Sequence, residues 1–396
     1  MIELELPEPI PAVKPKPVKV ASSAPAHLGF LDGLRGGAAL WVLLSHCMLW
    51  GAWERIRLPD AKIAVDVFMV LSGFLMVRLS LERDEREPIG TTSTAMRFWI
   101  RRFFRIAPLY YLVVAFAFIF GQSFKAGVAR LIAANPDHFI HLQSAHLPQY
   151  THYTLSNLLM HLSFLFGFVP AFASSTLLPD WSIGLEMQFY LAFPLMMFLY
   201  RRLPAISATL LIFAIGAFLK RLTLHALGQD AFPEASFLPL KINVFMAGML
   251  LAFANRPLGQ PWVNRALLLV AALCVASLAS SYIVVLAALI FLMTAQTQNS
   301  EPLVQWAKGW LARILGNPVA RFMADTSYCV YLVHNFFIAF VGSWLHRQDG
   351  ISDSKRALLL ICLTVAGSYS LAFVLHHLVE QKGIRLGQQI IKRLRS

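Results

Sequence analysis

Long apolar stretches separated by short charged connections dominate the chain. Each is close to the 20 or so residues that a helix needs to cross a hydrocarbon core of about 30 Å. Because the apolar runs are continuous rather than alternating, they predict helices and not the strands of a β-barrel. The stretches lie at about 34–53, 63–81, 103–122, 184–200, 205–222, 238–255, 264–279, 281–297, 326–345 and 356–379, with a further one at 155–173.

The composition supports an all-α, polytopic integral membrane protein. Hydrophobic residues make up 57% of the 396 residues and charged residues only 14%, whereas a soluble domain is about 25% charged. The formal net charge is +13, but Lys and Arg gather at the ends of the apolar stretches. That distribution is typical of the cytoplasmic ends of membrane helices. We therefore expect membrane lipids as partners and no nucleic acid.

The positions of the basic residues predict the orientation. Lysines in the N-terminal segment, arginines between 78 and 105, and Arg201 with Arg202 all mark cytoplasmic ends. The last 15 residues are basic as well. With both termini cytoplasmic the number of crossings is even, so we expect about ten transmembrane helices. The stretch 155–173 is then a re-entrant or interfacial helix.

Three regions are expected along the chain. Residues 1–27 are rich in Pro and Lys and lack an apolar run, which predicts a disordered cytoplasmic tail rather than a signal peptide. Residues 28–380 form the membrane domain. Residues 381–396 are predicted to be a basic cytoplasmic tail. No soluble domain of appreciable size is predicted.

Ionisable residues within a membrane helix are costly, so each marks a candidate site. The first stretch, "LDGLRGGAALWVLLSHCMLW", contains Asp32, Arg35 and His46. Eleven residues place Arg35 and His46 on one helix face, about 16 Å apart along the axis. Arg35 is expected at the cytoplasmic rim, where it can bind phosphate. His46, deeper in the membrane, can act as a base or nucleophile. A snorkelling arginine and a histidine bonded to another helix explain the spacing equally well.

The third stretch opens with "RRFFRIAPLYYL". Arg102 and Arg105 are three residues apart and so share a helix face. They are expected at the same cytoplasmic rim as Arg35. Three arginines around one rim predict a clamp for phosphate groups, because guanidinium matches phosphate geometry.

The segment "LPDWSIGLEMQFYLAFPL" begins another membrane helix from the outer side. Ser182 and Glu186 are four residues apart and share a face. A glutamate one turn into a membrane helix needs a partner, so Glu186 is expected to orient His46 or to bind a hydroxylated acceptor. Gln188 and Tyr190 are expected to point elsewhere.

Other polar residues have weaker signals. Asp66 lies near the outer end of "AVDVFMVLSGFLMVR", in which Gly73 permits close helix approach and Ser72 is expected to pack. Tyr331 and His334 share a face in "DTSYCVYLVHNFF", where interhelical hydrogen bonding explains them as well as function does.

The sequence contains no firm metal-ligand pattern and no nucleotide-binding motif. His138 and His141 could share a helix face, but no cysteine or carboxylate completes a ligand set, so no metal is expected. The four cysteines form no CxxC pair and are expected to be buried free thiols. Neither a GxxxxGK[ST] nor a GxGxxG motif occurs.

Five stretches together resemble the membrane acyltransferase-3 family, which modifies bacterial glycans. They are "LDGLRGGAALWVLLSH", "VDVFMVLSGFL", "RRFFRIAPLYY", "WSIGLEMQFYLAFPL" and "SYCVYLVHNFF", in the family's order. The resemblance implies transfer of an acyl group, acetyl by family frequency, from cytoplasmic acyl-CoA such as acetyl-CoA. The implied acceptor is a hydroxyl on the outer side of the bacterial inner (plasma) membrane, on a glycan or lipid-linked sugar.

The resemblance also implies roles for residues. Arg35 and His46 match the family's functional pair, Arg102 and Arg105 its arginine pair, and Glu186 its glutamate. A stand-alone form without an appended hydrolase-like domain is expected. "LVHNFF" lacks the proline that often follows the histidine in the family, which leaves the role of that histidine open.

A multi-pass transporter or exporter of a glycan or lipid-linked substrate is the alternative, because it also keeps buried charges around a cavity. Against it, no Gly- or Pro-broken segments recur in corresponding halves of the chain. The acceptor's identity, the acyl chain and the oligomeric state are not predicted. Whether His46 acts as a base or carries the acyl group also stays open.

Overall fold

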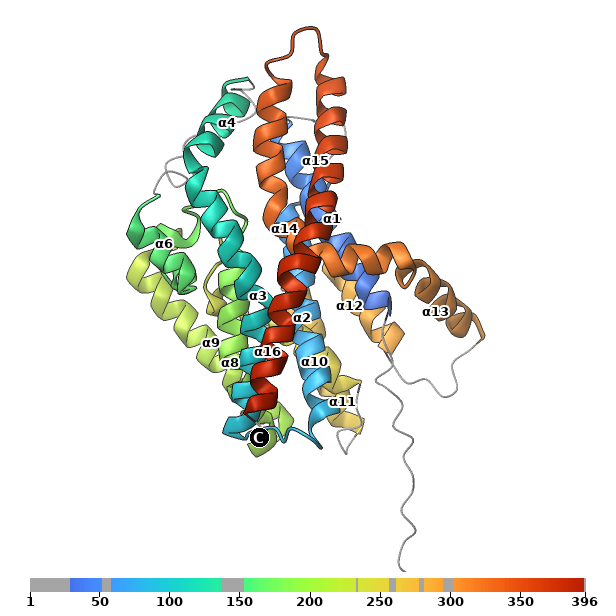
Figure 1. The fold of residues 1–396 in the computed structure, drawn as a ribbon. Coiled ribbons are helices and arrows are strands. Elements are labelled where there is room, and N and C mark those ends of the chain that lie inside the picture. The colour runs from blue at the N-terminus through green and yellow to red at the C-terminus, as the bar shows by residue number, and fades with distance from the viewer. Residues whose placement is uncertain are drawn as a thin grey trace, which may run out of the picture.

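The computed structural model describes residues 29–51, 58–134, 136, 153–232, 234–255, 261–277, 281–294 and 302–394. Regular elements in this part of the chain are helical throughout (Figure 1). In chain order they are α1 (Gly29–Trp50), α2 (Ala61–Arg83), α3 (Thr92–Ile119), α4 (Gly121–Ala134), α6 (Leu155–Leu162), η2 (Leu165–Phe168), α7 (Pro170–Ala173), α8 (Trp181–Arg202), α9 (Ala205–Leu227), α10 (Leu238–Ala254), α11 (Pro261–Ala276), α12 (Ser281–Thr294), α13 (Pro302–Leu315), α14 (Pro318–Leu345), α15 (Asp353–Leu375), the π-helical turn η3 (His376–Glu380) and α16 (Gln381–Arg393).

Six helices among the described residues are long and apolar enough to cross a membrane. They are α2, α3, α8, α9, α14 and the continuous helix Asp353–Arg393, formed by α15, η3 and α16. The prediction of an all-α, polytopic membrane protein is thus confirmed in its coarser form. The shorter apolar helices α10 and α11 match predicted stretches, as α1 and α12 do. About ten crossings and cytoplasmic termini stay predictions.

The stretch 155–173 does not form one crossing helix. It is divided into α6, η2 and α7, of eight, four and four residues. The break falls at Phe164, whose φ of 59° places it in the left-handed region, which interrupts a right-handed helix. Eight residues rise only about 12 Å. None of the three pieces can cross a core of about 30 Å.

Helices extend beyond several predicted boundaries. α14 begins at Pro318 rather than near 326, because Asn317 caps its N-terminus by accepting a hydrogen bond from the N–H of Ala320. Most of α4 lies between the predicted stretches 103–122 and 155–173, and neither α4 nor α13 was predicted. The N-terminal tail 1–27, His138 and His141 lie outside the described residues.

Residues 381–393 form a helix where a basic tail was expected. Gly383, Gly387 and Ile391 recur every four residues and form the buried face of α16. The two glycines let α16 approach α3 closely, Gly383 at the carbonyl of Phe104 and Gly387 at its side chain. The basic composition of this segment favours a tail, but its two glycines and Ile391 form a narrow packing stripe.

The basic segment ends gather at one end of the bundle. Nη1 of Arg201, at the end of α8, lies 2.8 Å from Oδ2 of Asp84, just after α2. Figure 1 shows the C-terminus at this same end, beside the connection between α2 and α3. The ends predicted to share the cytoplasmic side are therefore neighbours in the fold.

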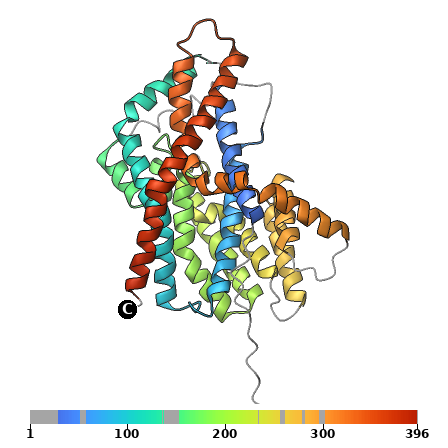
Figure 2. The ribbon, with the colours of Figure 1, turned by 45° about the vertical axis from the view of Figure 1, so that its right-hand side comes forward.

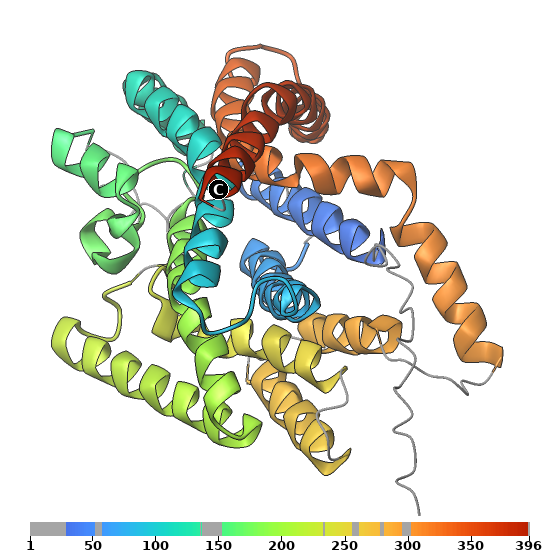
Figure 3. The ribbon, with the colours of Figure 1, turned by 60° about the horizontal axis from the view of Figure 1, so that its bottom comes forward.

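The helix α2 lies in the middle of the arrangement, with the other helices around it when the bundle is viewed from its lower end (Figure 3). α13 instead projects away from the bundle (Figure 2). α2 meets α10 at reciprocal glycines: Gly73 faces the carbonyl of Phe245, and Gly248 faces the carbonyl of Val70. Gly73 thus permits close helix approach, as predicted.

Adding one methyl group at this contact is expected to destabilise the protein. In Gly248→Ala the new Cβ would overlap the Val70 carbonyl oxygen, and such overpacking costs about 1–3 kcal/mol. Gly37→Ala is the matched control, because nothing lies within 4 Å of that position. In a thermal unfolding assay in detergent, Gly248→Ala should lower the midpoint and Gly37→Ala should not. Equal midpoints would contradict this packing.

Candidate active site

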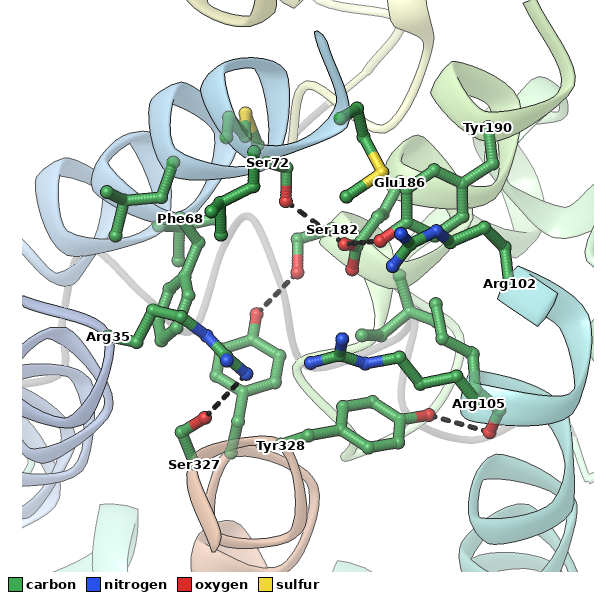
Figure 4. A pocket seen from close by; sticks show the side chains of 18 of the residues that line it. Arg35, Phe68, Ser72, Arg102, Arg105, Ser182, Glu186, Tyr190, Ser327 and Tyr328 are labelled. Atoms are coloured by element: carbon green, nitrogen blue, oxygen red, sulfur yellow. Dashed lines mark hydrogen bonds between the residues drawn. The ribbon is translucent and has the colours of Figure 1, made fainter. Parts of the chain in front are cut away.

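A central cavity of about 110 Å³ lies where α1, α2, α3, α8, α10 and α14 meet. Its walls combine apolar side chains with many polar ones (Figure 4). The polar residues that line it are Arg35, Ser72, Arg102, Arg105, Ser182, Glu186, Tyr190, Ser327, Tyr328 and Tyr331. The cavity therefore collects, from five helices, most of the residues that the sequence singled out.

The three predicted rim arginines share this cavity. Arg35 comes from α1, and Arg102 and Arg105 come from one face of α3 (Figure 4). Nη2 of Arg35 donates to Oγ of Ser327 at 3.4 Å. The Arg102 guanidinium lies 5.5 Å from the ring centroids of Phe98 and Tyr190, a cation–π geometry.

These arginines have no close carboxylate partner. Among the described residues, no ion pair within 4 Å involves Arg35, Arg102 or Arg105. Arg102 is buried, and its Nε has no hydrogen-bond partner. The neighbouring Arg101, in contrast, has an Nη2 2.7 Å from Oε2 of Glu87. Guanidinium donors in the cavity are therefore free to bind an anionic group.

Glu186 has partners other than the one expected. Its Oε1 accepts a hydrogen bond from Oγ of Ser72 at 3.1 Å and another from the hydroxyl of Tyr190. It does not bond His46, so the expectation that it orients this histidine is not met. Tyr190 was wrongly expected to point elsewhere. Its position one turn after Glu186 was the available signal.

Ser72 does more than pack. It lines the cavity and donates to Glu186, a residue 114 positions further along the chain. No spacing rule connects residues so far apart in sequence, so only the fold could reveal this pair.

Ser182 and Tyr331 close another side of the cavity. Tyr331 donates its hydroxyl hydrogen to the carbonyl of Pro179 at 2.6 Å. Ser182 Oγ, at 2.8 Å, must then donate to the Tyr331 oxygen. One turn later, Nδ2 of Asn335 donates to the carbonyl of Leu177 at 3.0 Å. α14 thus holds the segment that leads into α8.

His46 lies outside the cavity lining, in a pair with His334. Nδ1 of His46 is 2.8 Å from Nε2 of His334, and the two ring planes are nearly parallel, at 20°, with centroids 5.1 Å apart. The Tyr331 ring, which borders the cavity, lies 6.1 Å from the His334 ring. Arg35 and His46 both contact α14, so they lie on one face of α1, as the spacing predicts.

The two predicted aspartates lie outside the cavity lining. Asp66 accepts from Nζ of Lys241 through both carboxylate oxygens, at 2.8 and 2.9 Å. Lys241 therefore links α10 to α2. Asp32, in the first turn of α1, interacts electrostatically with Arg35.

One group of the described residues could hold a metal ion. Cys329, His376 and Glu380 bring three ligand atoms within 4.8 Å of one another. Cys329 Sγ donates to Oε2 of Glu380 at 3.4 Å, and Nδ1 of His376 lies 2.9 Å from the same oxygen. Nε2 of Gln381 is 3.1 Å from Nε2 of His376. Hydrogen bonds alone thus satisfy these groups.

Glu380 was missed by the sequence interpretation. It lies in the π-helical turn η3, just past the predicted end of the last apolar stretch at 379. Its carboxylate is buried and interacts electrostatically with Arg35 and Arg105. It therefore balances part of the positive charge beside the cavity.

Comparison with known proteins gives a match over most of the chain. Residues 28–375 match a family model described as "Acyltransferase domain". No solved structure matches the chain.

Three bacterial proteins show how far the similarity extends. Peptidoglycan O-acetyltransferase OatA of Listeria monocytogenes is 28% identical over 190 residues, which cover 47% of this chain and 26% of that protein. O-acetyltransferase OatA of Staphylococcus aureus strain NCTC 8325 is 26% identical over 237 residues, which cover 59% of this chain and 36% of that protein. A protein of S. aureus strain COL, provisionally named an O-acetyltransferase, is 24% identical over 353 residues, which cover 79% of this chain and 51% of that protein. The chain thus spans about half the length of that relative.

Proposed function

This chain belongs to the acyltransferase-3 family, and from that premise we propose that it is a membrane-bound O-acyltransferase. It transfers an acyl group, acetyl in our proposal, from cytoplasmic acyl-CoA to a hydroxyl of a glycan or lipid-linked sugar. The acceptor is reached from the outer side of the bacterial plasma membrane. The names of the relatives support acetyl as the acyl group and a glycan as the acceptor.

One observation carries the proposal: three arginines without a close carboxylate partner line a cavity, and another residue of that lining, Tyr331, lies beside a histidine pair. Arg35, Arg102 and Arg105 suit the phosphates of CoA, because each guanidinium can form two parallel hydrogen bonds to one phosphate. Arg35 and His46 are separated by about 16 Å along α1. An extended donor with phosphates at one end and a thioester at the other fits this separation.

The acceptor hydroxyl reacts at His46 in this proposal. By one route its oxygen bonds to the thioester carbonyl carbon while its proton moves to His46. The carbon–sulfur bond then breaks, and the departing CoA sulfur takes that proton. By the other route His46 itself bonds to the carbonyl carbon and CoA leaves as thiolate. The acceptor oxygen then displaces the histidine, and its proton ends on the CoA sulfur.

Glu186 is assigned to the acceptor rather than to His46. Its carboxylate already accepts from Ser72 and Tyr190, and a carboxylate oxygen has room for further donors. A sugar hydroxyl entering the cavity would find this acceptor beside Ser182. Glu186 would then hold the acceptor while its charge also stabilises the nearby arginines.

The membrane arrangement belongs to the same proposal. Ten crossing helices with both termini cytoplasmic would place the basic ends, which the fold gathers together, on the side where acyl-CoA is made. Residues 155–173 would then stay on the outer side.

Transfer of label in sealed vesicles tests the function directly. Inverted membrane vesicles containing the protein, given acetyl-CoA labelled in its acetyl group, should accumulate labelled glycan inside. Vesicles lacking the protein supply the background. An exporter would instead move unmodified glycan and leave no label on it. Mass spectrometry of envelope glycans from cells with and without the protein would then identify the acceptor.

A further inference from the structure

The hydrogen-bond partners of His334 fix the position of its own proton. Nδ1 of His334 lies 3.1 Å from the backbone carbonyl oxygen of Val330. A carbonyl oxygen can only accept, so Nδ1 carries the hydrogen. The His334 side chain is fully buried, and no carboxylate lies within 4 Å of it among the described residues. A buried unpaired charge is costly, so the ring is neutral and its lone pair lies on Nε2.

This arrangement determines the tautomer of His46 in turn. The only ring atom of His334 within hydrogen-bond distance of His46 is Nε2, 2.8 Å from Nδ1 of His46. Because that Nε2 carries a lone pair, Nδ1 of His46 must donate to it. A neutral His46 then has its own lone pair on Nε2.

We propose that His334 is the positioning residue of the active site, holding His46 with its hydrogen on Nδ1 and its lone pair on Nε2. This inference rests on the proposed function and deepens it. In hydrolases a buried carboxylate holds the catalytic histidine in the correct tautomer and orientation. Here the carbonyl of Val330 and the ring of His334 would hold the tautomer instead. Glu186 is then available to bind the acceptor.

The arrangement suits both proposed routes. Nε2 of His46 is the atom that accepts a proton or bonds to the acyl carbon, and neither event requires the ring to turn. If His46 gains a proton, Nδ1 continues to donate to His334. The side chain of Asn335 also interacts with His46, and its buried Oδ1 has no hydrogen-bond partner among the described residues. An amide oxygen can only accept, so it can receive a hydrogen bond from an N–H of His46.

Two matched amide variants separate positioning from packing. In His334→Gln the amide oxygen reaches about as far as Nε2 and can still accept from His46. In His334→Asn the side chain is shorter. Its amide can still donate to the carbonyl of Val330 but cannot reach Nδ1 of His46. We expect kcat to stay within about threefold of wild type in His334→Gln and to fall about 100-fold in His334→Asn. The KM for acetyl-CoA should be unchanged in both. Equal losses in the two variants would overturn the proposal.

Nitrogen-15 NMR of histidine-labelled protein in nanodiscs reads the tautomer without any assay of turnover. The chain has 12 histidines, so the His46 signals are assigned by their loss in His46→Asn. In wild type we expect His46 to have a protonated Nδ1 and an unprotonated Nε2. In His334→Asn we expect a mixture of the two His46 tautomers. The opposite tautomer in wild type would overturn the inference. Absence of acyl transfer by wild-type protein would instead refute the proposed function and leave this result standing.

Discussion

Acyl transfer is expected to fall by about three orders of magnitude when His46 is replaced by asparagine. The amide nitrogen of asparagine takes the place of Nδ1 and can still donate to His334, 2.8 Å away in the wild type. What the variant lacks is Nε2, the atom that takes the proton or the acyl group in the proposed mechanism. The measurement is the rate of label transfer from acetyl-CoA to glycan by purified protein in liposomes.

The control for this variant is binding of the donor. Arg35, Arg102 and Arg105 are unchanged, so the Kd for acetyl-CoA should match that of wild type, as should the elution volume in size-exclusion chromatography. Turnover close to wild type in a correctly folded His46→Asn protein would refute the assignment of His46. Incubation of wild type with labelled acetyl-CoA and no acceptor then separates the two routes, because only the acyl-histidine route leaves label on the protein.

The structure adds a requirement that the sequence did not suggest. Ser182 and Tyr331 line the cavity, whereas His46 does not. The Tyr331 hydroxyl bonds both Ser182 and the carbonyl of Pro179. The proposed transfer from the cavity to His46 therefore requires a rearrangement near Tyr331, whose ring lies 6.1 Å from that of His334, and we expect these hydrogen bonds to break. Binding of an acceptor hydroxyl, which can replace either partner, provides a reason for them to do so.

Features that depend on local helical geometry could be read from the sequence. The 11-residue spacing placed Arg35 and His46 on one face, and both contact α14. The three-residue spacing placed Arg102 and Arg105 on one face, and both line the cavity. Such predictions succeed because the helical period is fixed, whatever the helix packs against.

Partners from distant parts of the chain could not be read in this way. His46 and His334 are 288 residues apart, and neither helix period nor composition relates them. The same holds for Ser72, whose bond to Glu186 depends on how α2 packs against α8. The position of Glu380 could not be predicted because it lies in a π-helical turn. One extra residue in that turn shifts the helical register, so the regular α-helical period no longer tells which side chains share a face.

Replacing both Arg102 and Arg105 by glutamine is expected to weaken acetyl-CoA binding by about 100-fold or more. A hydrogen bond to a charged group contributes about 1.5–3 kcal/mol, and two such groups are lost from one cavity. Glutamine retains polar atoms and much of the side-chain length, which limits disruption of α3. The Kd is measured by isothermal titration calorimetry with purified protein.

The matched control lies on the same helix. Arg101 forms a bidentate pair with Glu87, at 3.1 and 2.7 Å, and does not line the cavity. Arg101→Gln removes one positive charge close to Arg102 but leaves the three cavity arginines unchanged. The Kd of this variant for acetyl-CoA should therefore stay within about threefold of wild type. Equal weakening in both proteins would indicate a general effect of positive charge and argue against a specific phosphate site.

A donor without phosphates shows which part of acetyl-CoA the arginines recognise. S-acetylpantetheine carries the thioester but none of the phosphate groups. Wild type should bind acetyl-CoA far more tightly than S-acetylpantetheine, and the Arg102→Gln/Arg105→Gln protein should lose most of that preference. If the variant weakened both ligands equally, the arginines would be acting on the pantetheine arm or on the fold. A loss confined to acetyl-CoA would instead place the phosphates at these two side chains, and the thioester end would then extend toward His46.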